Sequence, residues 1–369
     1  MGLLKGLVVK LSILMPSNRT TPGACGRILQ ACSWACDDIE VVVRDNSGSL
    51  DKQRILRSAE GPSRRIVIAD PCEAHENFVE TQKLARGGFV LFLGDDDCAF
   101  DRGVARIAEI AGRCLPDPGI VGITGSYLLE LAHGSQVAGY RDVGSENPVA
   151  RVGGYVAYQG PNLIFYSAIR REVADAAWAF MDAAPLKLPF HDQLLSLIYL
   201  LSGRFLDAGR LIFLYNTSNW DTAATSAASD LKIYATAGLD PAVRQLHWLL
   251  CGLEGAWLAM FSPFAMPYAL EQRQAMASRW FELMLRRFAG DRGHSYGSVL
   301  TPRATQLCEK WLQRAPHFDL AELLDDVSGF LATFAPDKAE SYRAFWTSVA
   351  PPSNGEVGRS RGTSSRRGL

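Results

Sequence analysis

The sequence lacks the features that mark several large classes of protein. Its formal net charge is −1, so no basic surface covers the whole molecule as it does in many nucleic-acid-binding proteins. No stretch reaches the roughly 18 uninterrupted apolar residues that a membrane-spanning helix needs. The eight cysteines are scattered without a C-x-x-C pair, which leaves no complete zinc site and favours reduced, mostly buried thiols. The first 15 residues contain no signal-peptide cleavage site, so we expect a cytoplasmic protein with at most peripheral contact with the inner face of the membrane.

Several enzyme motifs are missing as well. No G-x-G-x-x-G follows the first apolar run, which disfavours a dinucleotide-binding Rossmann domain, and no G-x-x-x-x-G-K-[ST] indicates a P-loop. No G-x-S-x-G supports an esterase. Sugar-1-phosphate nucleotidyltransferases usually carry a G-x-G-T-R loop after the first strand, and this chain has none there. With 48% hydrophobic and 21% charged residues, the composition is that of an ordinary soluble globular protein.

What the sequence does contain is an alternation of strand and helix patterns over its first 115 residues. We predict strands over residues 11–15, 39–44, 66–69 and 89–93, and helices over 22–34 and 76–86. Strands that alternate with helices of this length indicate β-α-β units and a parallel sheet.

After residue 115 the secondary-structure pattern of the sequence changes twice. Further strands are predicted over residues 120–124, 127–131, 163–165, 204–208 and 211–215, with a helix over 192–201. Glycines at 153–154 and 160 suggest loops around a site, and the small, polar stretch 223–229 suggests a hinge or mobile loop. From 230 to 350 the strand signals end, and the apolar patterns of 243–261, 271–288, 305–314 and 320–334 predict helices. Residues 351–369 cannot bury a core, so we expect them to be disordered.

The most informative motif is an acidic triplet, Asp95-Asp96-Asp97, which follows Gly94 and the apolar run 89–93. Ligands of open α/β sheets collect at the carboxyl ends of such strands. Three adjacent carboxylates repel one another unless a cation lies among them, and Mg²⁺ or Mn²⁺ would suit their oxygens. The alternative is a solvated acidic turn that caps a helix.

Polar residues also follow the other predicted strands. The expected members of one crevice are Pro16, Ser17, Asn18 and Arg19 after the first strand, Asp45 and Asn46 after the second, and Asn77 in the helix before the triplet. If the sheet is doubly wound, these positions converge at its carboxyl edge. The alternative for Asp45 is a turn without function, because Asn-Ser-Gly sequences favour turns.

These segments, "LSILMPSNR", "VVVRDNSGS" and "ENFVETQKLARGGFVLFLGDDD", together resemble the family 2 glycosyltransferases. The "FLGDDD" form is particularly similar to members that build bacterial polysaccharides, including abequosyltransferase-like enzymes. The resemblance covers about residues 10–216. It implies the α/β GT-A fold, with a mostly parallel, doubly wound sheet in a catalytic domain over 8–229. An all-helical domain would follow over 230–350, and a disordered basic tail over 351–369.

The resemblance also implies roles for the residues at the crevice. Residues 16–19 would border the nucleotide, and Asp45, with Asn46 and Asn77 beside it, would accept a hydrogen bond from the base. Asp95 and Asp97 would bracket the ribose and the metal, and Asp96 would also bind the donor. Asp97 would be the direct ligand of Mn²⁺ or Mg²⁺, with Asp95 contributing, and the metal would neutralise the diphosphate leaving group.

A second acidic motif is carried by "LPFHDQLLSLIYLLSGRFLDAGRLIFLYN". It resembles the family motif in which two acids open a helix, but His191 replaces the first acid. Asp192 therefore becomes the candidate general base, provided that its pKa is raised from the ordinary value near 4. The alternatives are an N-cap role for Asp192 and a hydrogen-bonded structural role for His191, which could instead contact metal or phosphate. Trp220 could close over the donor on a mobile loop.

The sequence thus predicts an inverting, metal-dependent glycosyltransferase of the hexosyl or deoxyhexosyl class. It would move a sugar from a nucleotide-diphospho donor to an acceptor hydroxyl, in a carbohydrate or a lipid-linked acceptor of bacterial surface polysaccharide synthesis. The helical part would set acceptor specificity or subunit contacts in an oligomer. Two alternatives remain open, a non-catalytic nucleotide-sugar-binding protein and a glycosyltransferase acting on a nucleic-acid base. The arginines of the tail hint at nucleic acid but equally favour anionic lipid.

Overall fold

The structure is a computed structural model that describes residues 9–131, 134–158, 162–188, 190–216, 223–236, 238–290, 301–314 and 319–350. Within these ranges the strands form one sheet in the order β3-β2-β1-β4-β8-β6-β9-β5, with β7 paired to β6. The strands are β1 (Leu11–Ser17), β2 (Ile39–Asp45), β3 (Arg64–Ile68), β4 (Phe89–Phe92), β5 (Cys98–Ala99), β6 (Ile120–Leu131), β7 (Gly134–Ala138), β8 (Ala168–Arg170) and β9 (Arg204–Asn216).

Helices connect these strands and then make up the C-terminal third of the chain. Those of the first part are α1 (Pro22–Ser33), α2 (Leu50–Arg57), α3 (Ala74–Gln82), α4 (Asp101–Cys114), α5 (Pro148–Ala157), α6 (Arg171–Ala183) and α7 (His191–Ser202). Those of the second are α8 (Ala223–Thr236), the 3₁₀ helix η1 (Pro241–Leu246), α9 (His247–Phe261), α10 (Leu270–Gly290), α11 (Pro302–Arg314), α12 (Leu320–Leu331) and α13 (Pro336–Val349).

The sheet is mostly parallel, as the sequence predicts. Strands β3, β2, β1 and β4 run parallel, and β6 and β9 form a second parallel pair. Antiparallel β8 joins the two groups by pairing with both β4 and β6. Parallel neighbours need crossover connections, which α1, α2 and α3 supply for the first group. The mixed α/β class with a helical C-terminal region is therefore confirmed.

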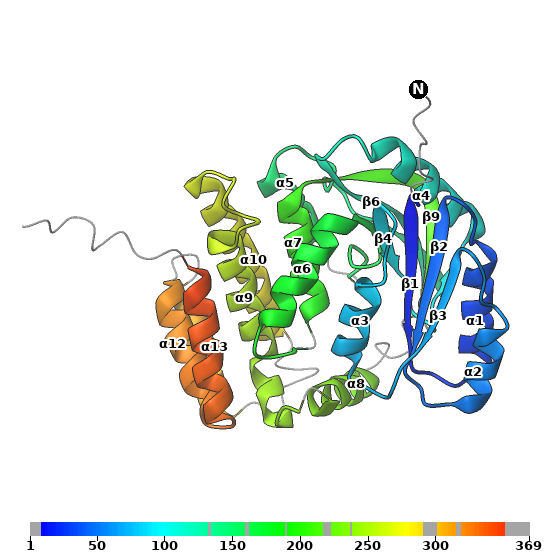
Figure 1. Ribbon diagram of the computed structural model, residues 1–369. Coiled ribbons are helices and arrows are strands. Elements are labelled where there is room, and N and C mark those ends of the chain that lie inside the picture. The colour runs from blue at the N-terminus through cyan, green and yellow to red at the C-terminus, as the bar shows by residue number, and fades with distance from the viewer. Residues whose placement is uncertain are drawn as a thin grey trace, which may run out of the picture.

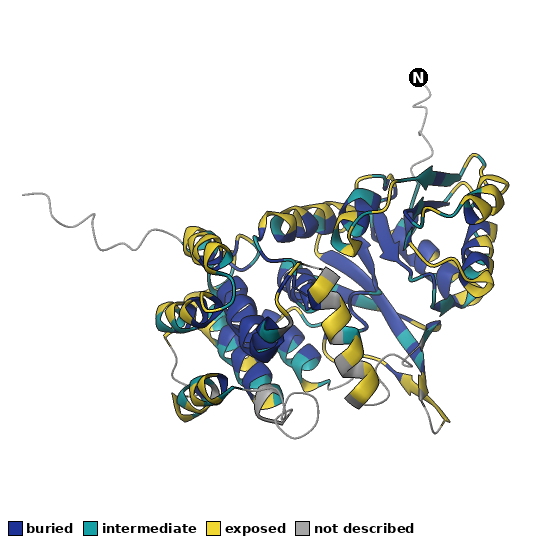
Figure 2. Ribbon diagram, turned by 90° about the horizontal axis from the view of Figure 1, so that it is seen from below, coloured by how far each residue is buried: buried dark blue, intermediate teal, exposed yellow. Residues whose placement is uncertain are grey.

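Both faces of the sheet are covered by helices (Figure 1). Leu14 and Val42 point into a core shared with α3, α6 and α7, whereas Ile13 and Val41 point into a second core shared with α1, α2 and α4. Because alternate residues of each strand are buried on opposite sides, the strands have continuous apolar sequences. Figure 2 shows the result, a buried sheet between helices whose outer sides are exposed.

The C-terminal helices continue the first of these cores. Helix α9 is apolar on all sides and is buried along most of its length, in contact with α7, α10 and α12. Trp280 of α10, Trp311 of α11 and Trp346 of α13 are fully buried in the same apolar cluster as Leu14 of β1. The described C-terminal helices therefore pack on one face of the sheet through one continuous apolar core.

Several sequence predictions about local structure are wrong. The apolar residues 163–165 form a turn instead of a strand, with the N–H of Tyr166 donating to the carbonyl of Leu163 at 3.2 Å, and the strand is β8. The expected loop at 153–154 lies inside α5, and the expected hinge at 223–229 is the first half of α8. Two pairs of predicted strands each form one strand, β6 and β9, with irregular register between their halves.

Some expectations lie outside the described residues or remain untested. The basic tail 351–369, the glycine at 160 and Trp220 are outside the described ranges. None of the described helices has the length and apolar character that crossing a membrane requires. The described cysteines, including the buried Cys25, Cys32, Cys114 and Cys251, are free thiols. The division into domains at residue 229 stays a prediction.

Candidate active site at the carboxyl edge of the sheet

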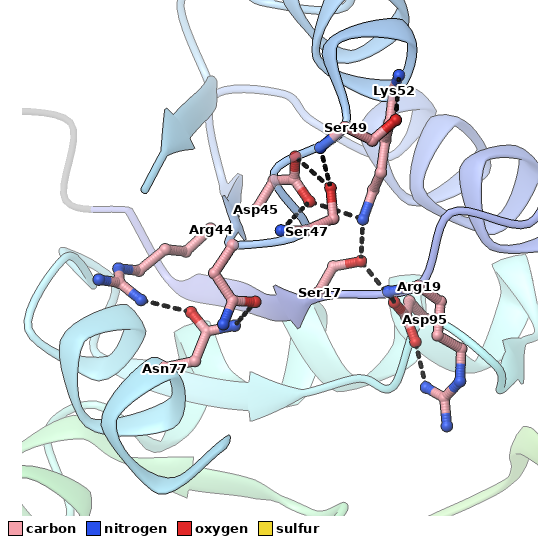
Figure 3. Close-up of polar contacts among 10 residues, drawn as sticks. Ser17, Arg19, Arg44, Asp45, Ser47, Ser49, Lys52, Asn77 and Asp95 are labelled. Carbon is pink, nitrogen blue, oxygen red and sulfur yellow. Dashed lines mark hydrogen bonds and ion pairs between the residues drawn. The ribbon is translucent and has the colours of Figure 1, made fainter. Parts of the chain in front are cut away.

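The strand-end residues predicted from sequence meet at the carboxyl edge of β1, β2 and β4. In the parallel register Ser17 lies opposite Asp45, and the N–H of Asn46 donates to the carbonyl of Ser17 at 3.0 Å. The hydroxyl of Ser17 donates to the carboxylate of Asp95, which follows β4. Figure 3 shows this chain of contacts across the three strand ends. One polar crevice thus contains the predicted motifs of three separate segments.

Arg19 holds the acidic turn in place. Its guanidinium pairs with Asp95 and, at 2.8 Å, with Asp96. Although partial burial opposes the charge, these two carboxylates raise the pKa of Arg19. Asp95 and Asp97 are buried. A Cβ on Gly94 would come within 2.8 Å of the Asp97 carboxylate, so a larger residue at this position would force the acidic side chains to shift.

Lys52 of α2 is a buried partner that the sequence analysis did not identify. Its ammonium lies 2.7 Å from Asp45 Oδ1 and donates to the Ser17 hydroxyl at 2.7 Å. Both side chains of the Lys52–Asp45 pair are almost fully buried, at 1% and 0% exposure. Helix α2 begins at the N-cap Ser49, whose side chain accepts from the N–H of Lys52. An N-cap serine at position 49 was the sequence signal that could have placed Lys52 in the first turn of a helix.

A second polar group lies beside Asp45. The guanidinium of Arg44 donates to Asn77 Oδ1 at 2.6 Å, and the Asn77 amide donates to Asn46 Oδ1 at 2.8 Å. Asn46 in turn donates to the carbonyl of Cys72 at 2.9 Å. Of these residues Asn46 and Asn77 are buried, as expected for a scaffold of the crevice. Pro16 is half-buried, and Asn18 is exposed at the rim.

Two half-buried tyrosines lie within electrostatic reach of both the acidic turn and Asp192. The rings of Tyr166 and Tyr215 lie 5.6 Å apart. Burial raises the pKa of both tyrosines, and the negative charges of Asp97 and Asp192 raise it further. Because electrostatic effects of this kind fall off with distance, both carboxylates lie close enough to this pair of rings to act on them. Sequence analysis did not identify either tyrosine, since single aromatic residues are usually core residues.

Asp192 has the environment that a general base needs. Burial raises its pKa to about 6, although the amide of Asn162, which donates to Oδ2 at 3.0 Å, and the positive charge of Arg287 oppose the shift. The N-cap of α7 is Phe190, which makes no capping side-chain bond, so Asp192 lies in the first turn and not at the cap. The condition set by the sequence analysis, a pKa raised from near 4, is met.

His191 is held differently. It is buried, its Nε2 accepts from the N–H of Leu188 at 3.2 Å, and its Nδ1 has no hydrogen-bond partner. Burial lowers its pKa well below the usual value, so the ring is neutral. This arrangement favours the structural alternative for His191 over a phosphate contact.

Comparison with known proteins identifies relatives only at the level of structure. No protein-family model and no curated protein matches the sequence. Two solved structures of S. aureus TarS 1–349, one in complex with UDP-GlcNAc, match at a TM-score of 0.50 and 12% identity, covering 92% of this chain and 90% of that chain. The chain shares the fold of this TarS fragment. A mannosyltransferase, PcManGT from Pyrobaculum calidifontis in complex with GDP-Man and Mn²⁺, matches at a TM-score of 0.42 and 12% identity, covering 92% and 85%, and supports no inference at that score.

The comparisons do not test the more specific predictions that were made from the sequence. At 12% identity, the likeness to the TarS fragment concerns the fold and not the activity. It gives no support to the more specific resemblance to abequosyltransferase-like enzymes.

The acidic turn would suit a cation held by few protein ligands. The described residues contain no group of three or more His, Cys, Asp or Glu side chains arranged as a metal site. Both oxygens of Asp95 accept hydrogen bonds, from Ser17 and Arg19, so they are largely occupied. Arg19 pairs with Asp95 and Asp96 and its charge also interacts with that of Asp97, and a divalent ion could add to this compensation of three adjacent carboxylates. The residues present therefore fit an ion bound mainly through Asp97 and completed by phosphate oxygens.

Proposed function

We propose that the chain is a glycosyltransferase that moves a sugar from a nucleotide-diphospho donor to an acceptor hydroxyl with inversion of configuration. The observation that carries the proposal is the placement of Asp192, a carboxyl group with a pKa of about 6, beside the tyrosine pair that also borders Asp97. A base and a donor-side acid that both act on the same pair of rings would suit a displacement reaction. The shared fold with the TarS fragment, which was solved with UDP-GlcNAc, supports a nucleotide-sugar donor.

In the proposed reaction, Asp192 takes the proton of the acceptor hydroxyl. The hydroxyl oxygen attacks the anomeric carbon on the face opposite the diphosphate, and the bond from that carbon to the diphosphate oxygen breaks. A base with a pKa near 6 is deprotonated at neutral pH and still basic enough to accept a proton as the bond forms. The nucleoside diphosphate leaves with the electron pair of the broken bond.

The donor side would be held by the residues of the crevice. We propose that Arg19, Asn18 and Pro16 border the nucleotide and that Asp45 and Asn77 lie on the base side. Asp45 is already paired with Lys52, so the carboxylate reaches the base in a fixed orientation. Asp95 would face the ribose, and Asp96 would also lie on the donor side. A Mn²⁺ or Mg²⁺ ion at Asp97, when bound, would neutralise charge on the diphosphate.

The wider setting follows from the family resemblance of the sequence. Members that resemble this chain build bacterial polysaccharides, so we propose a hexosyl or deoxyhexosyl transfer to a carbohydrate or lipid-linked acceptor. The alternative, a non-catalytic nucleotide-sugar-binding protein, would keep the donor crevice but would not need a base at Asp192. Donor turnover therefore separates the two.

Calorimetric titration with UDP, GDP, CDP and dTDP tests the donor side of the proposal. At least one nucleotide should bind in the presence of Mn²⁺, and the Asp97→Asn variant should weaken that binding about tenfold or more because a charged ligand is lost. Asp101→Asn is the matched control, since Asp101 is an exposed acid at the start of α4. Binding that survives both EDTA and Asp97→Asn unchanged would remove the metal from the proposal.

A further inference from the structure

A cavity of about 510 Å³ lies between α5 and α10, outside the donor crevice. Helix α5 contributes Val156 and Ala157 to its lining. Helix α10 contributes Arg279, Glu282, Leu283, Arg286 and Arg287. Their positions i, i+3, i+4, i+7 and i+8 lie on one face of the helix. Three guanidinium groups and one carboxylate make the cavity strongly positive. A ligand with negative charge would match it.

Two of the three arginines, Arg279 and Arg286, are exposed and can reach a ligand. Arg286 pairs with Glu282, but both side chains are largely in solvent, at 73% and 42% exposure, and such pairs contribute little to stability. Arg279 is exposed and donates to the carbonyl of Val149 at 3.2 Å. A Cβ on Gly153 of α5 would lie 2.7 Å from Arg279 Nη1, so the small residue leaves room for the guanidinium. Donors remain free to meet a ligand, because each guanidinium has five N–H groups.

The cavity adjoins the candidate base. The guanidinium of Arg287 lies over the ring of Trp248, 5.2 Å from its centroid, and donates to Gln193 Oε1 at 3.4 Å. Gln193 directly follows Asp192. The positive charge of Arg287 also acts on the Asp192 carboxylate. A molecule in the cavity would therefore extend toward the group that deprotonates the acceptor.

We propose that this cavity is an acceptor subsite that binds a phosphate group, so that the acceptor carries a phosphate near the hydroxyl that receives the sugar. Guanidinium groups bind phosphate through two parallel hydrogen bonds and are the preferred side chains for this task. The proposal rests on the proposed glycosyltransferase function and adds a substrate class to it. The phosphate belongs either to a soluble sugar phosphate or to the headgroup of a lipid-linked acceptor.

The binding test uses inorganic phosphate and the intact chain. Calorimetry at constant ionic strength, with any nucleotide that binds present at saturation, compares the wild type with Arg279→Gln/Arg286→Gln and with Arg286→Gln alone. We expect phosphate to bind the wild type and the double variant to bind it at least tenfold more weakly, with the single variant between. Arg287 is left intact because it contacts Gln193. Arg343→Gln is the control, since Arg343 is an exposed arginine of α13 paired with Asp325.

Equal phosphate affinity in the wild type and the double variant would overturn the subsite. So would an equal loss in Arg343→Gln, which would indicate general attraction to positive charge. Melting temperatures of all variants check that they fold. Loss of nucleotide binding together with phosphate binding would point to structural damage, and Arg286→Gln alone then decides the question.

The acceptor test compares matched pairs of sugars with and without a phosphate monoester. Wild-type donor turnover should respond at least tenfold better to the phosphorylated member, and the double variant should lose that preference through a higher KM. Binding to vesicles of phosphatidylcholine with phosphatidic acid tests the lipid alternative. If the wild type binds these vesicles and the double variant does not, the phosphate belongs to a lipid carrier. Donor turnover that prefers neutral acceptors would overturn the subsite and leave the glycosyltransferase standing. Failure of every nucleotide to bind would overturn the glycosyltransferase itself, whatever the phosphate result.

Discussion

At the scale of single residues, the sequence identifies the acids of the crevice and Arg19, but not the buried cation that holds Asp45. Asp45, Asp95 and Asp97 stand out because they follow predicted strands, at whose carboxyl ends the ligands of open α/β sheets bind. Lys52 does not, because lysine on a short amphipathic helix is normally a surface residue. Its burial depends on how α2 returns to the sheet, which is a tertiary property. For the same reason Tyr166 and Tyr215 could not be assigned from the sequence.

The buried Lys52–Asp45 pair leads to a stability prediction. Lys52→Met should lower the free energy of unfolding by about 3–5 kcal/mol, because it leaves the buried carboxylate without its cation. Urea denaturation measures the change. Lys83→Met is the matched control, since the Lys83–Glu80 pair is exposed and its loss should cost less than about 1 kcal/mol. Similar losses in the two variants would mean that the buried pair does not orient Asp45.

The pKa of Asp192 sets the expected pH dependence of turnover. The base acts only when deprotonated, so kcat should fall about tenfold per pH unit below pH 6 and level off above it. Asp192→Asn should lower kcat about 10²-fold or more while donor affinity stays within about threefold. Asn162→Ala removes a hydrogen bond that favours the charged form, so the acidic limb should move to higher pH. Parallel losses of donor affinity and turnover in Asp192→Asn would make Asp192 a structural residue.

At the scale of elements, sequence patterns locate the buried strands better than the surface helices. The apolar runs of β1, β2 and β4 have no other plausible structure, whereas α2 has arginines, a lysine and an aspartate among few apolar residues. The stretch 223–229 resembles a loop because its residues are small, but alanine is the best helix former, and Tyr234 anchors the helix by a 3.0 Å hydrogen bond to His247 Nδ1. Residues 163–165 are apolar because a turn is buried there.

Close packing of α9 against α10 gives a prediction about helix contacts. A Cβ on Gly255 of α9 would lie 2.0 Å from Nε1 of the buried Trp280, so Gly255→Ala should destabilise the protein by about 1–3 kcal/mol through overpacking. Gly329 of α12 has nothing within 4 Å of the same added atom. Gly329→Ala should therefore stabilise by about 0.5–1 kcal/mol, the ordinary preference of helices for alanine. Thermal unfolding of the pair measures the difference, and equal shifts would contradict the close approach.

At the scale of the whole molecule, the described C-terminal helices share one apolar core with one face of the sheet. Leu194 and Leu197 of α7 belong to the same cluster as Leu250 of α9 and Trp280 of α10. The sequence predicts the helical content of the C-terminal third from its periodic pattern. It does not predict how closely these helices pack on the sheet, because partner choice depends on side chains distant in sequence. The proposed phosphate subsite is a product of that packing.

Because the core is continuous, a fragment without the C-terminal helices should not fold. Ending the chain at residue 222, before α8, exposes the apolar side of α7 and part of α6, and a patch of that kind favours aggregation or a molten state. We expect low soluble yield, binding of hydrophobic dyes and loss of the near-UV circular dichroism signal. Ending the chain at residue 350 is the control and should leave the melting temperature unchanged. A 1–222 fragment that unfolds cooperatively and binds a nucleotide would show that the helical part is a separable domain, and the phosphate subsite would then have to be tested as an interface between two domains.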